Sequence, residues 1–133
     1  MSNSEQSNII NSDPPNIGVI KKYLKPNEKT VFTYGDKIYN PGNWPLQPDI
    51  IAHELVHVRQ QGGAPNIWWE KYLENPAWRL KQELEAYREQ WKFIQKTKER
   101  NKSMLLIQFA QTLSSEIYGN LIDYATAAKL IKQ

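Results

Sequence analysis

The segment from Asp49 to Gln61 constrains this chain more than any other part of the sequence. It contains His-Glu-Leu-Val-His at positions 53–57 and, with it, both histidines of the chain. In a helix, residues four apart lie one turn apart on the same face, so both imidazoles could reach one metal ion. Glu54 follows the first histidine and would lie beside that ion, where it can accept a proton from water without being a ligand.

The surrounding residues predict a helix over 49–61. Pro48 gives a break, Asp49 would cap the helix, and the glycines at 62–63 would stop it. At about 100° per residue, one apolar stripe is formed by Ile51, Leu55 and Val58. The histidines and Glu54 lie on the opposite side, an arrangement that suits the floor of a cleft. The alternative is a pair of surface histidines on an ordinary helix.

Length and composition narrow the class of protein. A chain of 133 residues is enough for one domain with a single core. It has no cysteine, so nitrogen and oxygen ligands must hold any metal. The net charge of +3 is small, so a nucleic-acid partner is not required. Because there is no membrane-spanning run and no apolar signal-peptide segment, we expect no membrane association and a cytoplasmic location.

The N-terminal part combines an expected arm with a short β segment. Residues 1–16 are rich in Ser and Asn, which predicts a flexible arm, followed by a single domain over 17–133. Residues 17–24 would form a strand or a helical turn. Residues 30–39 predict a β-hairpin or a pair of edge strands. An edge strand here could hold an extended peptide through main-chain hydrogen bonds, or it could only cover the motif helix.

The middle of the chain predicts two further helices. Residues 66–73 would form a short one, whose aromatic side chains line a pocket or pack in the core; these are Trp68, Trp69 and Tyr72. A long helix would begin at Asn75-Pro76, with Asn as its cap, and run to about Arg100. Its apolar residues recur at intervals of three and four, which is the helical signature.

The C-terminal part predicts a helical hairpin over about 103–131. Its first helix would span 103–118, and its second, capped by Asp123, would span 124–131. Two helices joined by a short turn either close a helical domain or form a DNA-binding helix-turn-helix. No face rich in Arg or Lys is evident, so nucleic-acid binding is not the expected role.

The long helix also offers a third metal ligand. A catalytic zinc site takes three protein ligands and keeps one position open, so without further His or Cys the third must be a carboxylate. Glu83 lies roughly 70° from the centre of the apolar stripe of this helix, and Glu85 roughly 130° away. We therefore favour Glu83 over Glu85. The alternative is that both are solvated charges paired with Arg79 or Arg88.

Several segments together resemble a known group of proteins. The motif helix at 53–61, Trp-Trp-Glu-Lys-Tyr-Leu at 68–73 and Glu-Leu-Glu-Ala-Tyr at 83–87 are similar to small metallopeptidases of the gluzincin type, many of them encoded by phages and prophages. The ending from 113 to 120 is similar to the tail of those proteins. The resemblance covers residues from about 17 onward. With the predicted elements, it implies an α+β, mostly helical minimal zincin fold: a small N-terminal sheet, the motif helix and a second ligand-bearing helix.

The resemblance carries an expectation for individual residues. In gluzincins the first Glu of a Glu-x-x-Ala-Asp or related pattern is the third ligand, and on this sequence that position is Glu83. The sequence departs from the pattern at Tyr87, where the commoner form has Asp. That Asp orients a histidine ligand, so its absence at Tyr87 leaves the tuning of the site open.

Motif and resemblance predict a zinc-dependent metallopeptidase that acts on a peptide or protein substrate. The expected Zn²⁺ ligands are His53, His57 and Glu83. Glu54 would be the general base, taking a proton from water and delivering it to the leaving amine. Tyr72 and Tyr87 are candidates for stabilising the oxyanion. The alternative is a non-catalytic, zinc-stabilised phage structural or regulatory protein that binds a protein or nucleic acid through its C-terminal helices.

Overall fold

The computed structural model describes residues 8–133 and has an α+β fold that is mostly helical, as predicted. Its helices are α2 (Ile17–Tyr23), α3 (Pro48–Gln61), α4 (Pro65–Glu74), α5 (Pro76–Gln95), α6 (Lys102–Leu113) and α7 (Tyr124–Lys132), with a 3-10 turn η1 (Glu116–Tyr118). Within residues 8–133, none of the helices has the length and apolar character needed to cross a membrane.

The sheet has three short strands, β1 (Ile9–Ile10), β2 (Phe32–Tyr34) and β3 (Lys37–Tyr39), in the order β1-β3-β2. Strands β2 and β3 form the predicted antiparallel hairpin, with Thr33 opposite Ile38. Gly35 in its turn has a φ of +66°, a conformation that favours glycine. Among the described strands β2 lies at an edge, and it is the strand that packs on α3.

Strand β1 corrects part of the expected N-terminal arm. Residues 1–7 of that arm lie outside the described residues, but residues 9 and 10 pair in parallel with β3. The amide of Asn40 donates to the carbonyl of Ile10 at 2.7 Å. Two consecutive isoleucines favour a strand once a partner is available, and that partner comes from a distant part of the chain.

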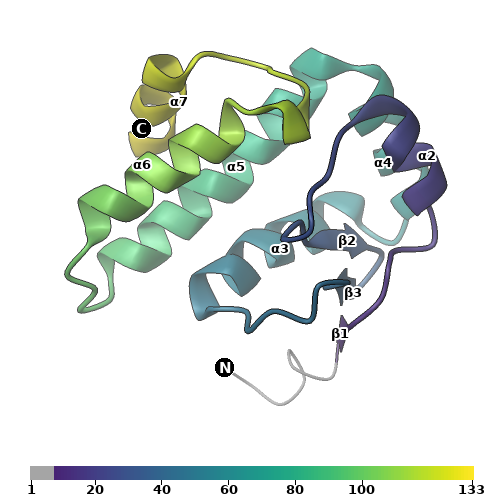
Figure 1. Cartoon of the computed structure of the whole chain (residues 1–133), viewed down its shortest axis with the longest axis horizontal. Helices are drawn as coiled ribbons and strands as arrows, with labels where there is room; N and C mark the ends of the chain where they lie inside the picture. The colour runs from purple at the N-terminus through teal and green to yellow at the C-terminus, as the bar shows by residue number, and fades with distance from the viewer. Residues whose placement is uncertain (1–7) are drawn as a thin grey trace.

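Helix α5 runs through the middle of the molecule (Figure 1). It packs against α3 and α4 on one side and against α6 and α7 on the other. The apolar core is divided in the same way. One cluster joins α2, β2 and α4 and contains Ile20, Leu24, Phe32, Trp68, Trp69, Tyr72 and Leu73. The other joins α5, α6 and α7 and contains Tyr87, Ile94, Phe109, Ala110, Leu113, Ala127 and Ile131.

Several predicted helix ends agree with the structure. The side chain of Asn75 caps α5 by accepting from the amide of Trp78 at 3.0 Å. Asp123 caps α7 in the same way, and Gly62 ends α3 in the left-handed conformation. The segment 17–24, predicted as a strand or a helical turn, contains the helix α2.

Three predicted boundaries are wrong. Helix α3 begins at Pro48 with Gln47 in the cap position, so Asp49 lies inside the first turn. Helix α5 ends at Gln95 rather than near position 100. Just after this end, the Thr97 hydroxyl donates to the carbonyl of Ile94 at 2.7 Å. The helix expected over 103–118 ends at Leu113 and is followed by η1. Where α5 and α6 end, the hydroxyls of Thr97 and Ser114 donate to carbonyls of the last helical turn, a local bond that competes with continuation of the helix.

Candidate metal centre and cleft

Helices α3 and α5 bring three predicted ligands together. His53 and His57 come from α3 and Glu83 from α5, and each is less than 5% exposed. One donor atom from each lies within 4.8 Å of the others. The three side chains therefore form a buried group that could hold a metal ion.

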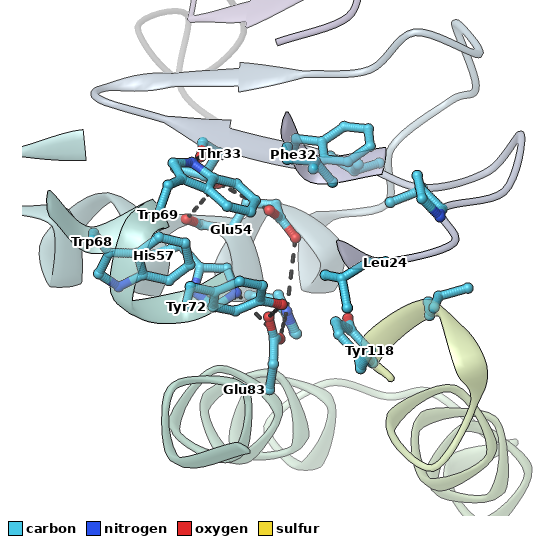
Figure 2. A pocket seen from close by; sticks show the side chains of 16 residues that line it. Leu24, Phe32, Thr33, Glu54, His57, Trp68, Trp69, Tyr72, Glu83 and Tyr118 are labelled. Carbon is cyan, nitrogen blue, oxygen red and sulfur yellow. Dashed lines mark hydrogen bonds and ion pairs between the residues drawn. The ribbon is translucent and has the colours of Figure 1, made fainter. Parts of the chain in front are cut away.

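The carboxylate of Glu83 is held on both oxygens. Its Oε1 lies 3.2 Å from Nε2 of His53 and 3.3 Å from Nε2 of His57. Its Oε2 accepts a 2.5 Å hydrogen bond from the hydroxyl of Tyr72, which reaches it from α4 (Figure 2). Tyr72 therefore fixes one oxygen and leaves the other between the two imidazoles.

Glu54 lies beside this group without joining it. Its Oε1 accepts a 2.9 Å hydrogen bond from the hydroxyl of Thr33 on β2, and its Oε2 lies 3.7 Å from Nε2 of His53. Burial raises the pKa of the Glu54 carboxyl, and the neighbouring histidines only partly offset this effect. Glu54 is thus a buried carboxylate with one oxygen facing the same space as the ligand atoms (Figure 2).

Two glutamines orient the imidazoles, and neither was predicted. Nδ1 of His53 lies 2.9 Å from Oε1 of Gln90, whose Nε2 donates to Asp49 at 2.7 Å. We call Gln90 with Asp49 the buried bridge. This bridge orients His53, although Tyr87 stands at the position where the resembled proteins commonly have an orienting Asp.

The second imidazole has an equivalent arrangement. Nδ1 of His57 lies 2.7 Å from Oε1 of Gln60, whose Nε2 donates to Glu85 at 3.0 Å and to the carbonyl of Gln82 at 3.1 Å. We call Gln60 with Glu85 the surface bridge. Glu85 is exposed, as its place on the helix predicted.

The arginines do not neutralise the two glutamates. Arg79 donates to the main-chain carbonyls of Tyr72 and Tyr118, at 2.7 Å and 2.9 Å, and Arg88 donates to the carbonyl of Leu130 at 2.9 Å. Both guanidinium groups therefore hold helix ends rather than carboxylates. The alternative of Glu83 as a solvated charge paired with an arginine does not agree with this arrangement.

The charges in the group stabilise one another when no metal is bound. Burial alone would lower the pKa of His57, but the carboxylates of Glu83 and Glu54 and the hydrogen bond to Gln60 together outweigh burial and raise that pKa to about 9. Burial would raise the pKa of Glu83, but the two histidines outweigh it and hold that pKa well below its ordinary value. At neutral pH the metal-free protein therefore carries a proton where a cation would bind.

A small apolar cavity opens beside the group. It has a volume of about 50 Å³ and is lined on one side by Trp68, Trp69 and Tyr72, which also belong to the core. Both expected roles of these aromatics are thus combined. Leu24 and Phe32 line the opposite part of the cavity (Figure 2).

A wider hollow of about 470 Å³ lies on the other side of His53 and Glu54. The two spaces adjoin at the candidate metal site, where they share Thr30, Val31, His53, Glu54, Ile117 and Tyr118; we refer to them together as the cleft. Tyr118 belongs to η1, between α6 and α7. The C-terminal hairpin therefore supplies a wall of the cleft.

The tyrosines proposed as oxyanion donors are already engaged. The Tyr72 hydroxyl donates to Glu83, and the Tyr87 hydroxyl lies 3.0 Å from that of Tyr118. The Tyr87 ring packs edge-on against the His53 ring, with 4.4 Å between their centroids. Tyr118 lines both spaces, and sequence reasoning missed it.

Some of the missed residues carried a usable signal. Gln90 follows Glu83 by seven positions, so it shares that face of α5, and Gln60 follows His57 by three positions on α3. Thr33 and Tyr118 carried no such signal, because their contacts join segments far apart in the sequence.

Comparisons with protein-family models, with curated proteins and with solved structures find no match to this chain.

Proposed function

We propose that this chain is a zinc-dependent metallopeptidase of the minimal zincin type. One observation carries the proposal: two imidazole nitrogens and one carboxylate oxygen converge, with the separate carboxylate of Glu54 beside them in a cleft. Two histidines and one carboxylate form a donor set found in catalytic zinc sites. A purely structural site would not need Glu54.

The two spacings from Glu83 to the imidazoles fit zinc. Ligand atoms at about 2.0–2.1 Å from a tetrahedral ion lie roughly 3.3 Å from one another. Oε1 of Glu83 lies 3.2 Å and 3.3 Å from the two imidazole nitrogens. Within residues 8–133 the group has three members, His53, His57 and Glu83, which leaves a position open.

The chemistry then depends on Glu54. A zinc ion bound at this site would supply a Lewis acid that makes water more acidic and polarises a carbonyl group. Glu54 would take the proton of the attacking water and deliver it to the leaving amine. Its burial favours this exchange, because a raised pKa brings the proton affinity of the carboxylate closer to that required near neutral pH. The Thr33 hydroxyl holds Oε1 in place while Oε2 faces the cleft.

The cleft suits an extended peptide. Strand β2 lies at the edge of the described sheet, and an edge strand can pair with a peptide through its free main-chain groups. The Thr33 carbonyl is not one of these groups, because it accepts from the side chains of Gln61 and Trp69 at 2.8 Å and 2.9 Å. The apolar cavity beside the ligands is lined by Phe32, the first residue of this strand, and by Val31 just before it. A peptide along this edge would place one side chain in the cavity, whose lining favours an apolar residue.

Metal content tests the proposal directly. The wild-type chain should bind about one zinc ion and Glu83→Ala should lose it, whereas the matched control Glu89→Ala, at an exposed position of the same helix, should keep it. Zinc per chain is measured after reconstitution and removal of loose metal. A wild-type protein without zinc, or a Glu83→Ala protein that retains it, contradicts the assignment.

Cleavage of a mixed peptide library tests the reaction separately. The zinc-loaded protein should cut peptides, with an apolar residue enriched at one position next to the cut. Zinc binding without cleavage would instead support the alternative, a non-catalytic zinc-stabilised protein.

A further inference from the structure

The two glutamine bridges impose an orientation on the histidines. An ionised carboxylate and a main-chain carbonyl can only accept hydrogen bonds, so the amide NH₂ of each glutamine must face them. The acceptor of the buried bridge is Asp49, and the acceptors of the surface bridge are Glu85 and the carbonyl of Gln82. Each amide oxygen must therefore face an imidazole.

That orientation fixes the tautomer of each ring. Since Oε1 of Gln90 and Oε1 of Gln60 accept, Nδ1 of His53 and Nδ1 of His57 must donate. In a neutral imidazole with a proton on Nδ1, Nε2 carries the free lone pair. When both rings are neutral, as metal ligands must be, both lone pairs face the space that they share with Oε1 of Glu83, where the candidate metal would lie.

We propose that Asp49 and Glu85 are positioning residues that set the histidine tautomers through a glutamine amide and so promote metal binding. No hydrogen bond joins either carboxylate to a histidine in the described structure. The inference rests on the proposed metal site, but it does not depend on catalysis.

The glutamine amides also keep the negative charges of Asp49 and Glu85 away from the histidine rings. A carboxylate bonded directly to a ligating histidine orients the ring and increases its basicity. Gln90 and Gln60 orient the rings without placing a charge against them, since Asp49 and Glu85 lie one amide further out. The carboxylates that lie directly against the Nε2 atoms are those of Glu83 and Glu54.

Substitutions at position 49 can remove or reverse the bias. Asn at this position can accept or donate, so Asp49→Asn removes the preference for one amide orientation. Lys only donates, so Asp49→Lys would turn the amide of Gln90 and favour the wrong tautomer of His53. Zinc affinity, measured by competition with a chromogenic chelator, should weaken by roughly 10-fold in Asp49→Asn and toward 100-fold in Asp49→Lys.

Matched controls separate this effect from charge alone. Glu89 is exposed on the same helix as Gln90, so Glu89→Gln and Glu89→Lys should leave zinc affinity within about 2-fold of wild type. Adding Gln90→Glu to Asp49→Asn restores an acceptor on Nδ1 of His53 and should restore the affinity. Glu85→Gln should have a smaller effect, because the carbonyl of Gln82 still orients Gln60.

Nitrogen NMR of the imidazoles gives a readout that a general structural effect would not move. The chain has two histidines, so each ring gives its own signals. With zinc bound, both rings should carry a proton on Nδ1. Asp49→Lys should change the His53 signals and leave those of His57, whereas Glu85→Gln should act on His57 alone.

Failure of this inference can be distinguished from failure of the proposed function. A wild-type protein that binds no zinc overturns both. A wild-type protein that binds zinc, with Asp49→Lys indistinguishable from Glu89→Lys in affinity and in the His53 signals, overturns the role of the bridges alone.

Discussion

Helix α5 buries two adjoining stripes of opposite character. Toward α3 and α4 it presents Arg79, Glu83 and Gln90, which we call the polar seam. Beside it, toward α6 and α7, lie Tyr87 and Ile94, part of a cluster that we call the apolar seam; the Tyr87 ring also contacts His53 of α3. Both seams are buried to a similar degree, so burial alone does not distinguish them.

The difference lies in how each seam is specified. In the polar seam each named side chain has a directed partner, and a buried polar group without one would be costly. In the apolar seam the contacts are non-directional, and their contribution follows the area buried. We therefore expect changes in the polar seam to act on metal binding and reaction, and changes in the apolar seam to act on the free energy of unfolding.

The largest effect is expected at Glu54, beside the polar seam. Glu54→Gln keeps the size of the side chain but cannot take a proton, so peptide hydrolysis should fall by about 10²- to 10⁴-fold or more. Zinc content should stay at the wild-type value, because Glu54 is not in the ligand group. Rates and zinc are measured on the same preparations. Normal cleavage by Glu54→Gln would end the proposed mechanism.

In the apolar seam, Leu113 offers the matching test. Its side chain is fully buried against α5 and α7, so Leu113→Ala should lower the free energy of unfolding by about 2–5 kcal/mol. Denaturant titration measures the loss, with the half-buried Leu106→Ala as a milder control. Zinc per folded chain should not change. Loss of zinc from a folded Leu113→Ala protein would show that the two seams are not independent.

Tyr72 tests a single bond of the polar seam. Tyr72→Phe removes the hydroxyl that holds Oε2 of Glu83, and a hydrogen bond to a charged group contributes about 1.5–3 kcal/mol. The metal-free protein should lose stability by that amount, and zinc binding should weaken because the second oxygen of Glu83 is no longer fixed. Tyr23→Phe, at a half-exposed ring, serves as the control. Equal effects of the two variants would remove Tyr72 from the site.

The smallest effect is expected when pH is changed by one unit and the stability of the metal-free protein is measured. The pKa of His57 is raised in the folded state to about 9, so its stabilising contribution is complete below about pH 6.5 and is lost as pH rises through 9. One proton gives a slope of at most about 1.4 kcal/mol per pH unit. Thermal unfolding from pH 6 to pH 10 measures it. His57→Gln should flatten the profile, and an unchanged profile would contradict the assigned ion pair.

Zinc should reverse this dependence. Metal binding displaces the proton from Nε2 of His57, so zinc affinity should rise across the same pH range in which the metal-free protein loses stability. Chelator competition at several pH values measures the change. An affinity that is independent of pH would mean that His57 does not exchange a proton for the metal.

How far the site could be predicted depends on the range of each interaction. The spacing of His53 and His57 within one helix is local, and helical angles were enough to favour Glu83 over Glu85. The orienting glutamines share helical faces with the ligands and could have been found in the same way. Thr33 and Tyr118 could not, because their roles arise where β2 and η1 meet the two helices.

The apolar stripe of α3 shows a limit of pattern reasoning. The sequence predicted one apolar stripe of Ile51, Leu55 and Val58, but only Ile51 is buried, and Leu55 and Val58 are half-buried. The motif face is buried instead, because α5 and β2 cover it with complementary polar groups. A periodicity of apolar residues cannot predict the burial of charged side chains that find partners elsewhere in the chain.

By itself the sequence determined the helices, the hairpin, the paired histidines and the choice of Glu83, since these depend on spacing within one element. Tertiary structure decided that Asp49 accepts a hydrogen bond from Gln90 instead of capping a helix, that residues 9 and 10 join the sheet, and that η1 lines the cleft. The physical reason is that hydrogen bonds and cavity walls form between segments. Their partners are defined only when the helices have packed.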